Sequence, residues 1–322
     1  MPAAEPSPSG QRVVGASVDL GSNSVHLVVA AIVGHHLEPL ADESAFLGLG
    51  SAVVARGLLG TTARVELAAQ LARYADTARS LGAVDVTFLG TEPIRRAVDA
   101  ARIVSDAAEA ADAPLHVLSH EEEAFLTIIG VTEGMPVTHE TLVVDVGGGS
   151  SEFCIVDATR RPRAAGLQLG SARLTDRFVT HDPPTQTEIA AIRAAAVDAL
   201  RGAPDVSPAE IVAVGGTASN LVKMLPEAIA DRFLTRERIA RIQATLATED
   251  AASTSAGHAV NPVRARLLPA GGAIVDAILE RYGADSIRVS EAGLREGVIL
   301  AVDHAGPCWR DRLSDLAHGW RT

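Results

Sequence analysis

Short apolar runs alternate along the chain with longer segments in which apolar residues recur at helical spacing. Each apolar run is bounded by glycine, acidic or polar residues, which is typical of buried strands. The runs lie at 13–18, 84–89, 115–118, 142–144, 152–156, 164–169, 211–214 and 287–290. Apolar residues recur at helical spacing in the segments 62–81, 95–111, 119–130, 186–200, 218–225, 235–246, 273–281 and 294–304. This alternation predicts an α/β fold.

Two of the apolar runs are followed by the same kind of turn. The stretch 142–156 reads LVVDVGGGSSEFCIV, in which a strand ends at Asp145 and Glu152 opens a returning strand. Residues 13–33 repeat this order near the N-terminus, with Asp19 at the end of the strand. The turn residues are Gly21, Ser22, Asn23 and Ser24 in the first hairpin and Gly147, Gly148, Gly149 and Ser150 in the second.

The hairpins match position for position at a separation of 126 residues, as Asp19-x-Gly21-x-x-Ser24 and Asp145-x-Gly147-x-x-Ser150. Such a repeat indicates two similar half-domains that face each other across a cleft. Glycines allow backbone conformations that side chains forbid, and they let consecutive N–H groups close around an anion. A single glycine run is equally typical of an ordinary hairpin and of a phosphate-binding turn. Because the turn occurs twice, we interpret the pair as a phosphate clamp, flanked by Asp145 and Glu152 as metal ligands or water-orienting groups.

Arginines and glutamates at two helix starts are further candidates. Arg95 and Arg96 open a helix against the preference of that end for negative charge, which favours a functional role for one of them, although solvated arginines are commoner. The helix from 119 begins with a capping box and carries three glutamates in its first turn. Acidic residues there usually only stabilise the helix, and spacing does not choose which one faces the cleft as a general base: Glu121, Glu122 or Glu123.

A third glycine turn follows the strand at 211–214. Gly215, Gly216 and Thr217 then lead into a helix. Strand, glycine turn and helix form a geometry that suits an anion at the positive helix end. Such turns are also common for packing alone, so this pattern is weak by itself.

The length and composition limit the class of protein. At 322 residues the chain favours two domains, and no apolar stretch is long enough to span a bilayer. The start, 1–12, is expected to be a disordered leader without the pattern of a secretory signal. Cys154 and Cys308 form no disulfide framework and no CxxC zinc motif, so a reducing cytoplasm is expected.

The net charge of −12 disfavours a broad nucleic-acid surface, which needs basic stripes to replace counterions. The same charge is unfavourable for a long polyanionic substrate. A phosphate chain would therefore need local basic residues, loop N–H groups and metal ions to offset the repulsion.

Seven segments, in this order, resemble the exopolyphosphatase/guanosine pentaphosphate phosphatase (Ppx/GppA) family. They are VDLGSNSVHLVV, the TxxxR of 91–95, SHEEEA, VVDVGGGSSE, VGGT, RAxxLPAG and GLREGVIL, and they span roughly residues 13–302. The resemblance implies an actin-like (sugar kinase/heat-shock ATPase) fold with two ribonuclease-H-like domains around a cleft. We expect an N-terminal domain at 13–130, a C-terminal domain at 131–305 and a tail at 306–322, as in the short, two-domain members.

The resemblance also implies roles for individual residues. Glu123 matches the glutamate that activates the attacking water, and Arg95 and Arg264 match arginines that face phosphate. Asp145 and Glu152, with Asp19, are expected to hold Mg²⁺, with Mn²⁺ as an alternative. The two turns and the segment from Gly215 to Thr217 would form the phosphate site. The implied reaction is hydrolysis of the terminal phosphoanhydride of inorganic polyphosphate, without nucleic acid or membrane as a partner.

Some residues depart from the family pattern, and several functions stay open. Arg266 stands where an acidic residue is usual, His120 where glycine or proline is common, and Glu92-Pro93 is unusual in the arginine motif. The alternatives are hydrolysis of guanosine pentaphosphate, an ATP-dependent kinase on the same fold, and a weakly catalytic sensor of phosphorylated nucleotides. Actin-like enzymes are frequently dimers, so a homodimer is one expectation.

Overall fold

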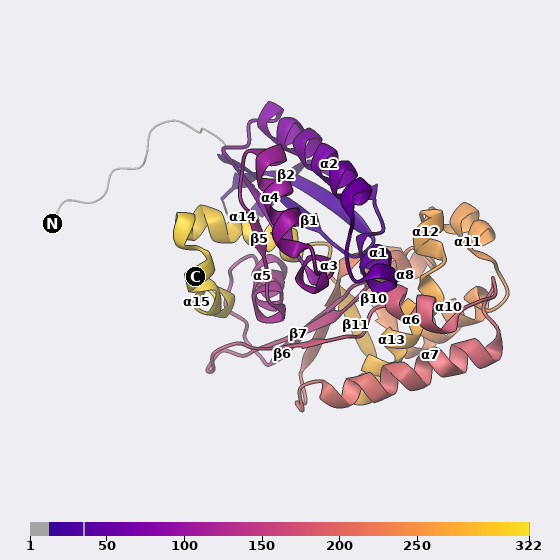
Figure 1. Ribbon diagram of the computed structural model, residues 1–322. Coiled ribbons are helices and arrows are strands. Elements are labelled where there is room, and N and C mark those ends of the chain that lie inside the picture. The colour runs from indigo at the N-terminus through magenta and orange to yellow at the C-terminus, as the bar shows by residue number, and fades with distance from the viewer. Residues whose placement is uncertain (1–12, 35, 322) are drawn as a thin grey trace.

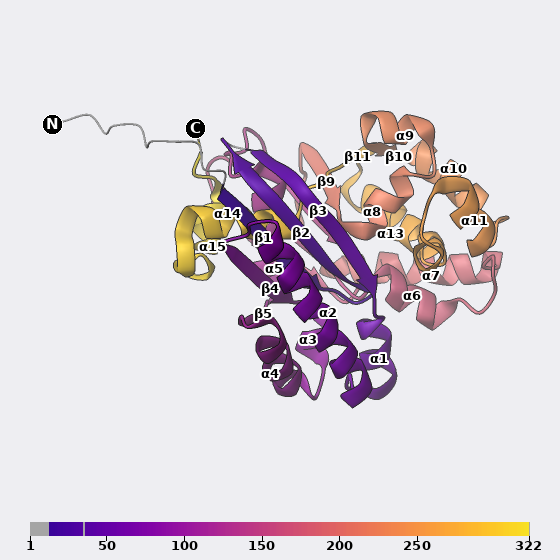
Figure 2. The same cartoon turned by 90° about the horizontal axis from the view of Figure 1, so that it is seen from above.

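The computed structural model describes residues 13–34 and 36–321, so the leader expected at 1–12 lies outside the described residues. Within these ranges the chain forms two β-sheets with helices around them, which confirms the expected α/β fold. Figure 1 and Figure 2 show the halves side by side, with the yellow C-terminal helices returning to the indigo first half. None of the helices in the described ranges is long and apolar enough to cross a membrane.

The first sheet has the strand order β3-β2-β1-β4-β5. Strands β1 and β2 form the first predicted hairpin, and β4 and β5 extend the sheet in parallel from β1. Helices α2 and α4 pack on this sheet through an apolar core. The elements are β1 (Val13–Leu20), β2 (Ser24–Val33), β3 (His36–Phe46), α1 (Leu49–Arg56), α2 (Thr61–Ser80), β4 (Asp85–Gly90), α3 (Glu92–Arg96), α4 (Ala100–Ala111) and β5 (Leu115–Val117).

The second sheet has the order β10-β11-β9-β6-β7-β8 and repeats the plan of the first. Strands β6 and β7 form the second predicted hairpin, and β9 and β11 run parallel to β6. The strands are β6 (Thr141–Val146), β7 (Ser151–Val156), β8 (Arg163–Leu167), β9 (Glu210–Val214), β10 (Phe233–Thr235) and β11 (Ser286–Val289). The helices are α6 (Ser171–Phe178), α7 (Gln186–Ala199), α8 (Gly215–Val222), α9 (Pro226–Asp231), α10 (Arg236–Leu246), α11 (Ala251–His258), α12 (Pro262–Ala265) and α13 (Leu268–Tyr282).

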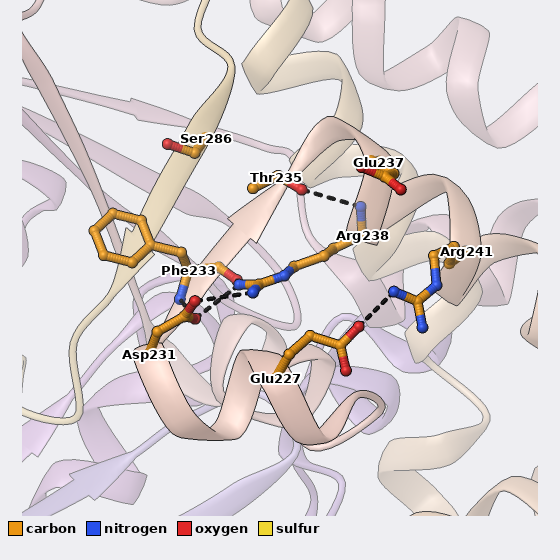
Figure 3. Close-up of a pocket in the computed structure, with 8 residues that line it drawn as sticks. All are labelled: Glu227, Asp231, Phe233, Thr235, Glu237, Arg238, Arg241 and Ser286. Carbon is orange, nitrogen blue, oxygen red and sulfur yellow. Dashed lines mark hydrogen bonds and ion pairs between the residues drawn. The ribbon is translucent and has the colours of Figure 1, made fainter.

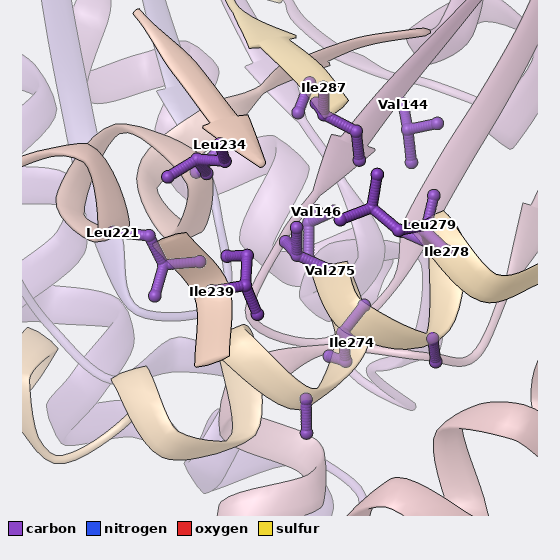
Figure 4. Packing of buried hydrophobic residues seen from close by; sticks show 14 of the residues in the cluster. Val144, Val146, Leu221, Leu234, Ile239, Ile274, Val275, Ile278, Leu279 and Ile287 are labelled. Carbon is purple, nitrogen blue, oxygen red and sulfur yellow. The ribbon is translucent and has the colours of Figure 1, made fainter. Parts of the chain in front are cut away.

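Helix α13 lies at the centre of the second half. Apolar side chains cover most of its circumference, as expected for a helix without a solvated face. Figure 4 shows Ile274, Val275 and Ile278 of α13 among Val146 of β6 and Ile287 of β11. This core fixes the ends of β6 and β9, from which the predicted phosphate turns extend.

Two helices connect the halves. Helices α5 (His120–Thr132) and α14 (Leu294–Ala305) pack against each other, with α5 on the second sheet and α14 also against β1. Gly130 and Gly297 allow this close approach, since a Cβ at Gly297 would lie 1.8 Å from the Leu126 carbonyl. The tail at 306–321 folds back onto α5 through α15 (Leu313–His318). The proposed domain boundaries stay a prediction, although α5 packs mainly on the second sheet.

Candidate functional site

A cavity of about 730 Å³ lies between the two halves. Residues from both predicted hairpins line it, together with Glu123 of α5 and the start of α8. Two predicted site residues do not line it, namely Arg95 and Thr217. The predicted residues that do are Asp19, Gly21, Ser22, Asn23, Ser24, Glu123, Asp145, Gly147, Gly148, Gly149, Ser150, Glu152, Gly215, Gly216 and Arg264.

The two hairpin turns have the same backbone hydrogen bond. The Gly21 N–H donates to the Ser24 carbonyl over 3.1 Å, and the Gly147 N–H donates to the Ser150 carbonyl over 3.0 Å. This equivalence confirms the match between the two sequence motifs. We name the turns loop 1 (21–24) and loop 2 (147–150).

The glycines of loop 2 are required for space. A Cβ at Gly148 would lie 2.6 Å from Asn23 Nδ2, and a Cβ at Gly149 would lie 2.6 Å from Ser22 Oγ. None of the loop glycines has a φ in the left-handed region, so the idea that they supply forbidden backbone conformations is wrong. The side chains of loop 1 fill the space that loop 2 leaves, and the loops therefore meet across the cleft.

Helix capping selects Glu123 among the three glutamates of α5. Glu122 closes the capping box with Ser119 and pairs with Arg310, while Glu121 is exposed. Glu123 is buried and lines the cleft. The capping box fixes the rotation of the first turn, and this rotation directs Glu123 inward.

Four carboxylates share the floor of the cleft with few compensating charges. Burial raises the pKa of Asp19 to about 7, that of Asp145 to about 6 and that of Glu152 to about 8. Burial and then the charge of Glu152 raise the pKa of Glu123 well above its usual value, against the opposing effect of Arg95. Asp19 Oδ1 is a buried atom without a hydrogen-bond partner in the described structure. A floor of this composition fits a divalent cation, which would favour the ionised carboxylates.

The described residues also bring His120, Glu123 and Glu152 close enough for one metal ion, with ligand atoms within 4.8 Å of one another. His120 Nδ1 lies 2.7 Å from Glu152 Oε1. This group shares only Glu152 with the predicted metal ligands Asp19, Asp145 and Glu152. The predicted ligand set therefore stays a prediction, and His120 is an additional candidate ligand.

Arg95 and Thr217 lie behind the cleft wall. Arg95 pairs with Glu123, donates to the Leu118 carbonyl over 2.6 Å and reaches the ring of His120. In this position it orients Glu123, and its contact with phosphate stays a prediction. Thr217 Oγ1 lies 3.2 Å from Ser171 Oγ beneath the floor.

Arg264 joins the two halves at the cleft. Its guanidinium donates to Ser24 Oγ over 3.0 Å and lies 5.6 Å from the centre of the Phe46 ring. A Cβ at Gly216 would lie 2.7 Å from Arg264 Nη1, so this glycine is required for the arginine to approach. By contrast, the nearby Arg266 pairs with Asp182. This structural contact accounts for an arginine at a position where the family usually has an acidic residue.

Sequence reasoning missed Arg295 at the start of α14. Its charge opposes the effect of burial on the pKa of both Asp19 and Asp145. Arg295 contacts His26 Nδ1, and His26 Nε2 in turn contacts Asp42, so two side chains from the first sheet hold it in the cleft. In the GLREG motif, as at Arg95, an arginine stands in the first turn of a helix. The sequence therefore contained the same indication of a functional role for Arg295.

Glu92, an unusual residue in the arginine motif, proves to connect the halves. Its buried carboxylate accepts from Arg173 Nη2 over 2.7 Å and from Ser22 Oγ over 3.2 Å. Arg173 also donates from Nε to the Gly149 carbonyl over 2.7 Å. Glu92 and Arg173 thus form a brace that ties loop 1 to loop 2.

A second hollow, of about 500 Å³, lies on the surface between α9 and α10 (Figure 3). Its charged side chains bind one another: Arg238 donates to Asp231 over 2.7 Å, and Arg241 pairs with Glu227. These arginines lower the pKa of both carboxylates, together with nearby backbone N–H groups. Because these charges are already paired, the interdomain cleft remains the candidate active site.

The chain is similar to known proteins over most of its length. Exopolyphosphatase 1 of Mycobacterium leprae is 27% identical over 300 residues, which cover 88% of this chain and 87% of that protein. Guanosine-5'-triphosphate,3'-diphosphate pyrophosphatase of Vibrio atlanticus is 24% identical over 287 residues, which cover 88% of this chain and 58% of that protein. A crystal structure of the Aquifex aeolicus Ppx/GppA family member superposes with a TM-score of 0.79 at 26% identity, covering 92% of this chain and 99% of that one.

These similarities confirm the actin-like fold that the sequence resemblance implied. A sequence model described as the Ppx/GppA phosphatase family matches residues 28–304, a range that includes loop 2 and the floor glutamates Glu123 and Glu152. The chain therefore belongs to the Ppx/GppA phosphatase family.

Proposed function

We propose that this protein is an exopolyphosphatase, which hydrolyses the terminal phosphoanhydride of inorganic polyphosphate and releases orthophosphate. The observation that carries the proposal is the meeting of loop 1 and loop 2 in one cleft with the buried Glu123. Relatives named exopolyphosphatase match most of the chain in support of this reading.

The chain's own groups supply binding, orientation and a base. Backbone N–H groups of the two loops and the guanidinium of Arg264 bind the terminal phosphate and complement the charge that develops on it. Glu123 orients a water molecule for in-line attack and accepts its proton. Arg95 fixes the Glu123 carboxylate and favours its ionised form, which a general base requires.

A divalent cation, Mg²⁺ or Mn²⁺, completes the proposal. Asp19, Asp145 and Glu152 would hold it, with His120 beside Glu152 as a further nitrogen ligand. The unpartnered Asp19 Oδ1 and the raised pKa values of the floor carboxylates fit such an ion. When bound, the ion would neutralise charge on the transferred phosphoryl group.

Hydrolysis of guanosine pentaphosphate is the second candidate. The Vibrio relative carries the name of that activity, and Phe46 offers an aromatic face at the cleft on which a base could stack. A nucleotide-dependent kinase or a non-catalytic sensor would need the same cleft.

One experiment separates these functions. Orthophosphate release is measured from long polyphosphate, tripolyphosphate and guanosine pentaphosphate, with and without Mg²⁺. We expect metal-dependent release from polyphosphate, and an about 10²–10⁴-fold loss in Glu123→Gln, since this is the usual contribution of a general base. Glu121→Gln, in the same helical turn but exposed, is the matched control.

Other results would point elsewhere. Faster release from the nucleotide would favour the second candidate, and transfer of labelled phosphate to an acceptor would indicate a kinase. Binding without release from any substrate would indicate a sensor, and full activity in Glu123→Gln would contradict the role of Glu123. A cytoplasmic location, which the two free cysteines favour, and a homodimer stay predictions from the sequence.

A further inference from the structure

The chain contains a single lysine, Lys223, and it lies at the cleft. Lys223 is exposed and directly follows the last residue of α8, the helix whose first turn forms the third predicted phosphate wall. Within the described part of the chain, its ammonium group makes no hydrogen bond or ion pair. An unpaired cation at the edge of an anion-binding cavity invites a functional explanation.

Helix α8 presents one continuous face to the cleft. After Gly215 at its first position, the cleft-lining residues of α8 and the adjoining Lys223 recur at positions i, i+3, i+4 and i+7, which is the spacing of one side of an α-helix. The other side, with Thr217, Ala218, Leu221 and Val222, is buried in the second half. We name the cleft-facing set the α8 stripe; it consists of Gly216, Ser219, Asn220 and Lys223.

The α8 stripe leads away from the catalytic floor. It begins at Gly216, where the Arg264 guanidinium packs against the backbone, and it ends at Lys223. Seven residues of helix advance by about 10 Å, because each residue adds about 1.5 Å. Lys223 therefore lies about 10 Å along the helix axis from Gly216, where it can meet a later part of a long substrate.

The charges along the cleft support this direction. The floor holds Glu123, Asp145 and Glu152, which repel a polyanion unless a metal ion is bound. The other charged residues of the lining are basic (Lys223, Arg232, Arg264 and Arg295) and acidic (Asp42, Glu92 and Glu291). Arg232 forms one ion pair, of 3.1 Å, with the exposed Glu291, and its Nε and Nη2 have no partner in the described structure. The acidic lining residues outside the floor are thus each paired with a basic side chain, as Asp42, Glu92 and Glu291 show, whereas the α8 stripe ends at Lys223, which is unpaired among the described residues.

We propose that the α8 stripe is a second binding region for phosphate groups that follow the scissile one, with Lys223 as its specificity-determining residue. A linear polyphosphate lies along α8 with its end at the two loops. This inference rests on the proposed function and specifies the substrate class, a polyphosphate long enough to reach Lys223. Pyrophosphate is too short to make this contact.

The first test uses the single lysine and needs no catalysis. The full-length Glu123→Gln variant, with Mg²⁺ present so that the floor does not repel a polyanion, is acetylated with N-hydroxysuccinimidyl acetate, and modification of the Lys223 peptide is followed by mass spectrometry. We expect long polyphosphate to slow acetylation at least about fivefold and pyrophosphate to leave it unchanged. Equal protection by both, or by neither, would overturn the proposal. If polyphosphate protects Lys223 but the wild-type protein releases no orthophosphate with Mg²⁺ present, the proposed enzymatic function fails while the binding region stands.

The second test separates binding from chemistry. Lys223→Gln should raise KM for long polyphosphate about fivefold, which is the upper range for the contribution of an exposed charge pair. The kcat for long polyphosphate should not change. Neither should kcat or KM for tripolyphosphate, the shortest substrate of the assay. Lys223→Arg should restore KM, since it restores the charge. Arg241→Gln, in the surface hollow of Figure 3, is the control and should leave KM unchanged. An unchanged KM in Lys223→Gln, or a fall in kcat alone, would contradict the proposal.

Discussion

Loop 1 and loop 2 have the same backbone hydrogen bond and opposite side-chain content. Loop 1 carries Ser22 and Asn23 at its tip, and loop 2 carries Gly148 and Gly149 at the corresponding positions. The side chains of the first occupy the space that the second leaves empty. Duplication therefore explains the shared backbone, whereas the difference in side chains explains how the two loops fit against each other.

The serines that end the loops differ in the same way. Ser24 of loop 1 accepts a hydrogen bond from Arg264, which belongs to the second half of the chain. Ser150 of loop 2 hydrogen-bonds Glu152 within its own hairpin and thereby opposes the rise in the pKa of that carboxyl. Loop 1 thus receives a contact from across the cleft in addition to bonds with its own half, and loop 2 holds a floor carboxylate. The comparison predicts different results when each loop is altered.

Gly149→Ala should have the largest effect, because it removes the complementarity directly. The new Cβ would lie 2.5 Å from Glu92 Oε2 and 2.6 Å from Ser22 Oγ, so the loops must separate. A displacement of about 1 Å in a catalytic site can lower the rate about 10²-fold, and we expect a loss of this order in kcat/KM. Steady-state phosphate release measures it.

Gly257→Ala is the matched control for that variant. Gly257 lies in α11, has no positive φ, and a Cβ there meets nothing within 4 Å. This variant should keep its activity and gain slightly in stability, since alanine is the better helix former. Wild-type activity in Gly149→Ala would show that close contact between the loops is not needed.

Glu92→Gln should have the next largest effect, since it removes the charge of the brace between the loops. Arg173 and Arg96 would lose their buried carboxylate partner, with side-chain exposure of only 6% at Glu92. We expect a loss of about 1–3 kcal/mol in unfolding free energy, measured by urea denaturation, and an about tenfold fall in kcat/KM.

Asp176→Asn provides the comparison for Glu92→Gln. Asp176 accepts a hydrogen bond of 3.4 Å from Ser51, also between α6 and the first half, but it is exposed and contacts neither loop. The Asp176→Asn variant should leave kcat/KM and the unfolding free energy nearly unchanged. Equal effects of the two variants would mean that any contact between the halves serves as well as the brace. Adding Arg173→Met to Glu92→Gln should cost less than the sum of the two single variants, because the two residues share one ion pair, while Arg173 also loses its bond to the Gly149 carbonyl.

The sequence predicted the local parts of this site and missed the long-range ones. The hairpins and the capping box depend on residues a few positions apart, so pattern and spacing were sufficient for them. Spacing left all three glutamates in the first turn of α5 open as the base, and only the family resemblance singled out Glu123. The hydrogen bond between Arg264 and Ser24 joins residues 240 positions apart, and the pair of Glu92 and Arg173 joins residues 81 apart. Such contacts depend on how the two halves pack against each other. A pattern among residues close together in the sequence does not predict that packing.

The two matched aspartates should differ in their response to pH. Folding raises the pKa of Asp19 to about 7 and that of Asp145 to about 6, so both carboxyls favour the protonated, folded state. Their contribution to stability is complete below pH 4 and is lost as the pH rises through 6 and 7. The metal-free protein should therefore melt several degrees lower at pH 8 than at pH 5, and Mg²⁺ should reverse most of this loss at pH 8.

Asp19→Asn and Asp145→Asn sharpen this comparison. Each variant should flatten the dependence of Tm on pH, and Asp19→Asn should flatten it more near pH 7, since of the two aspartates Asp19 has the higher pKa. Differential scanning calorimetry with a chelator present measures both. If Tm rises with pH in the metal-free wild-type protein, burial does not keep these carboxyls protonated as described.

Ser22→Ala should have the smallest effect. The Ser22 hydroxyl donates to Glu92 over 3.2 Å, so it is not free to donate to a phosphate, and the backbone of loop 1 keeps its own bonds, including that from the Gly50 N–H to the Ser22 carbonyl. Loss of one hydrogen bond costs about 1 kcal/mol, which corresponds to an about fivefold rise in KM if the loop position changes with it. A loss of 10²-fold or more, measured by phosphate release, would instead mean that this hydroxyl leaves Glu92 and binds the substrate directly.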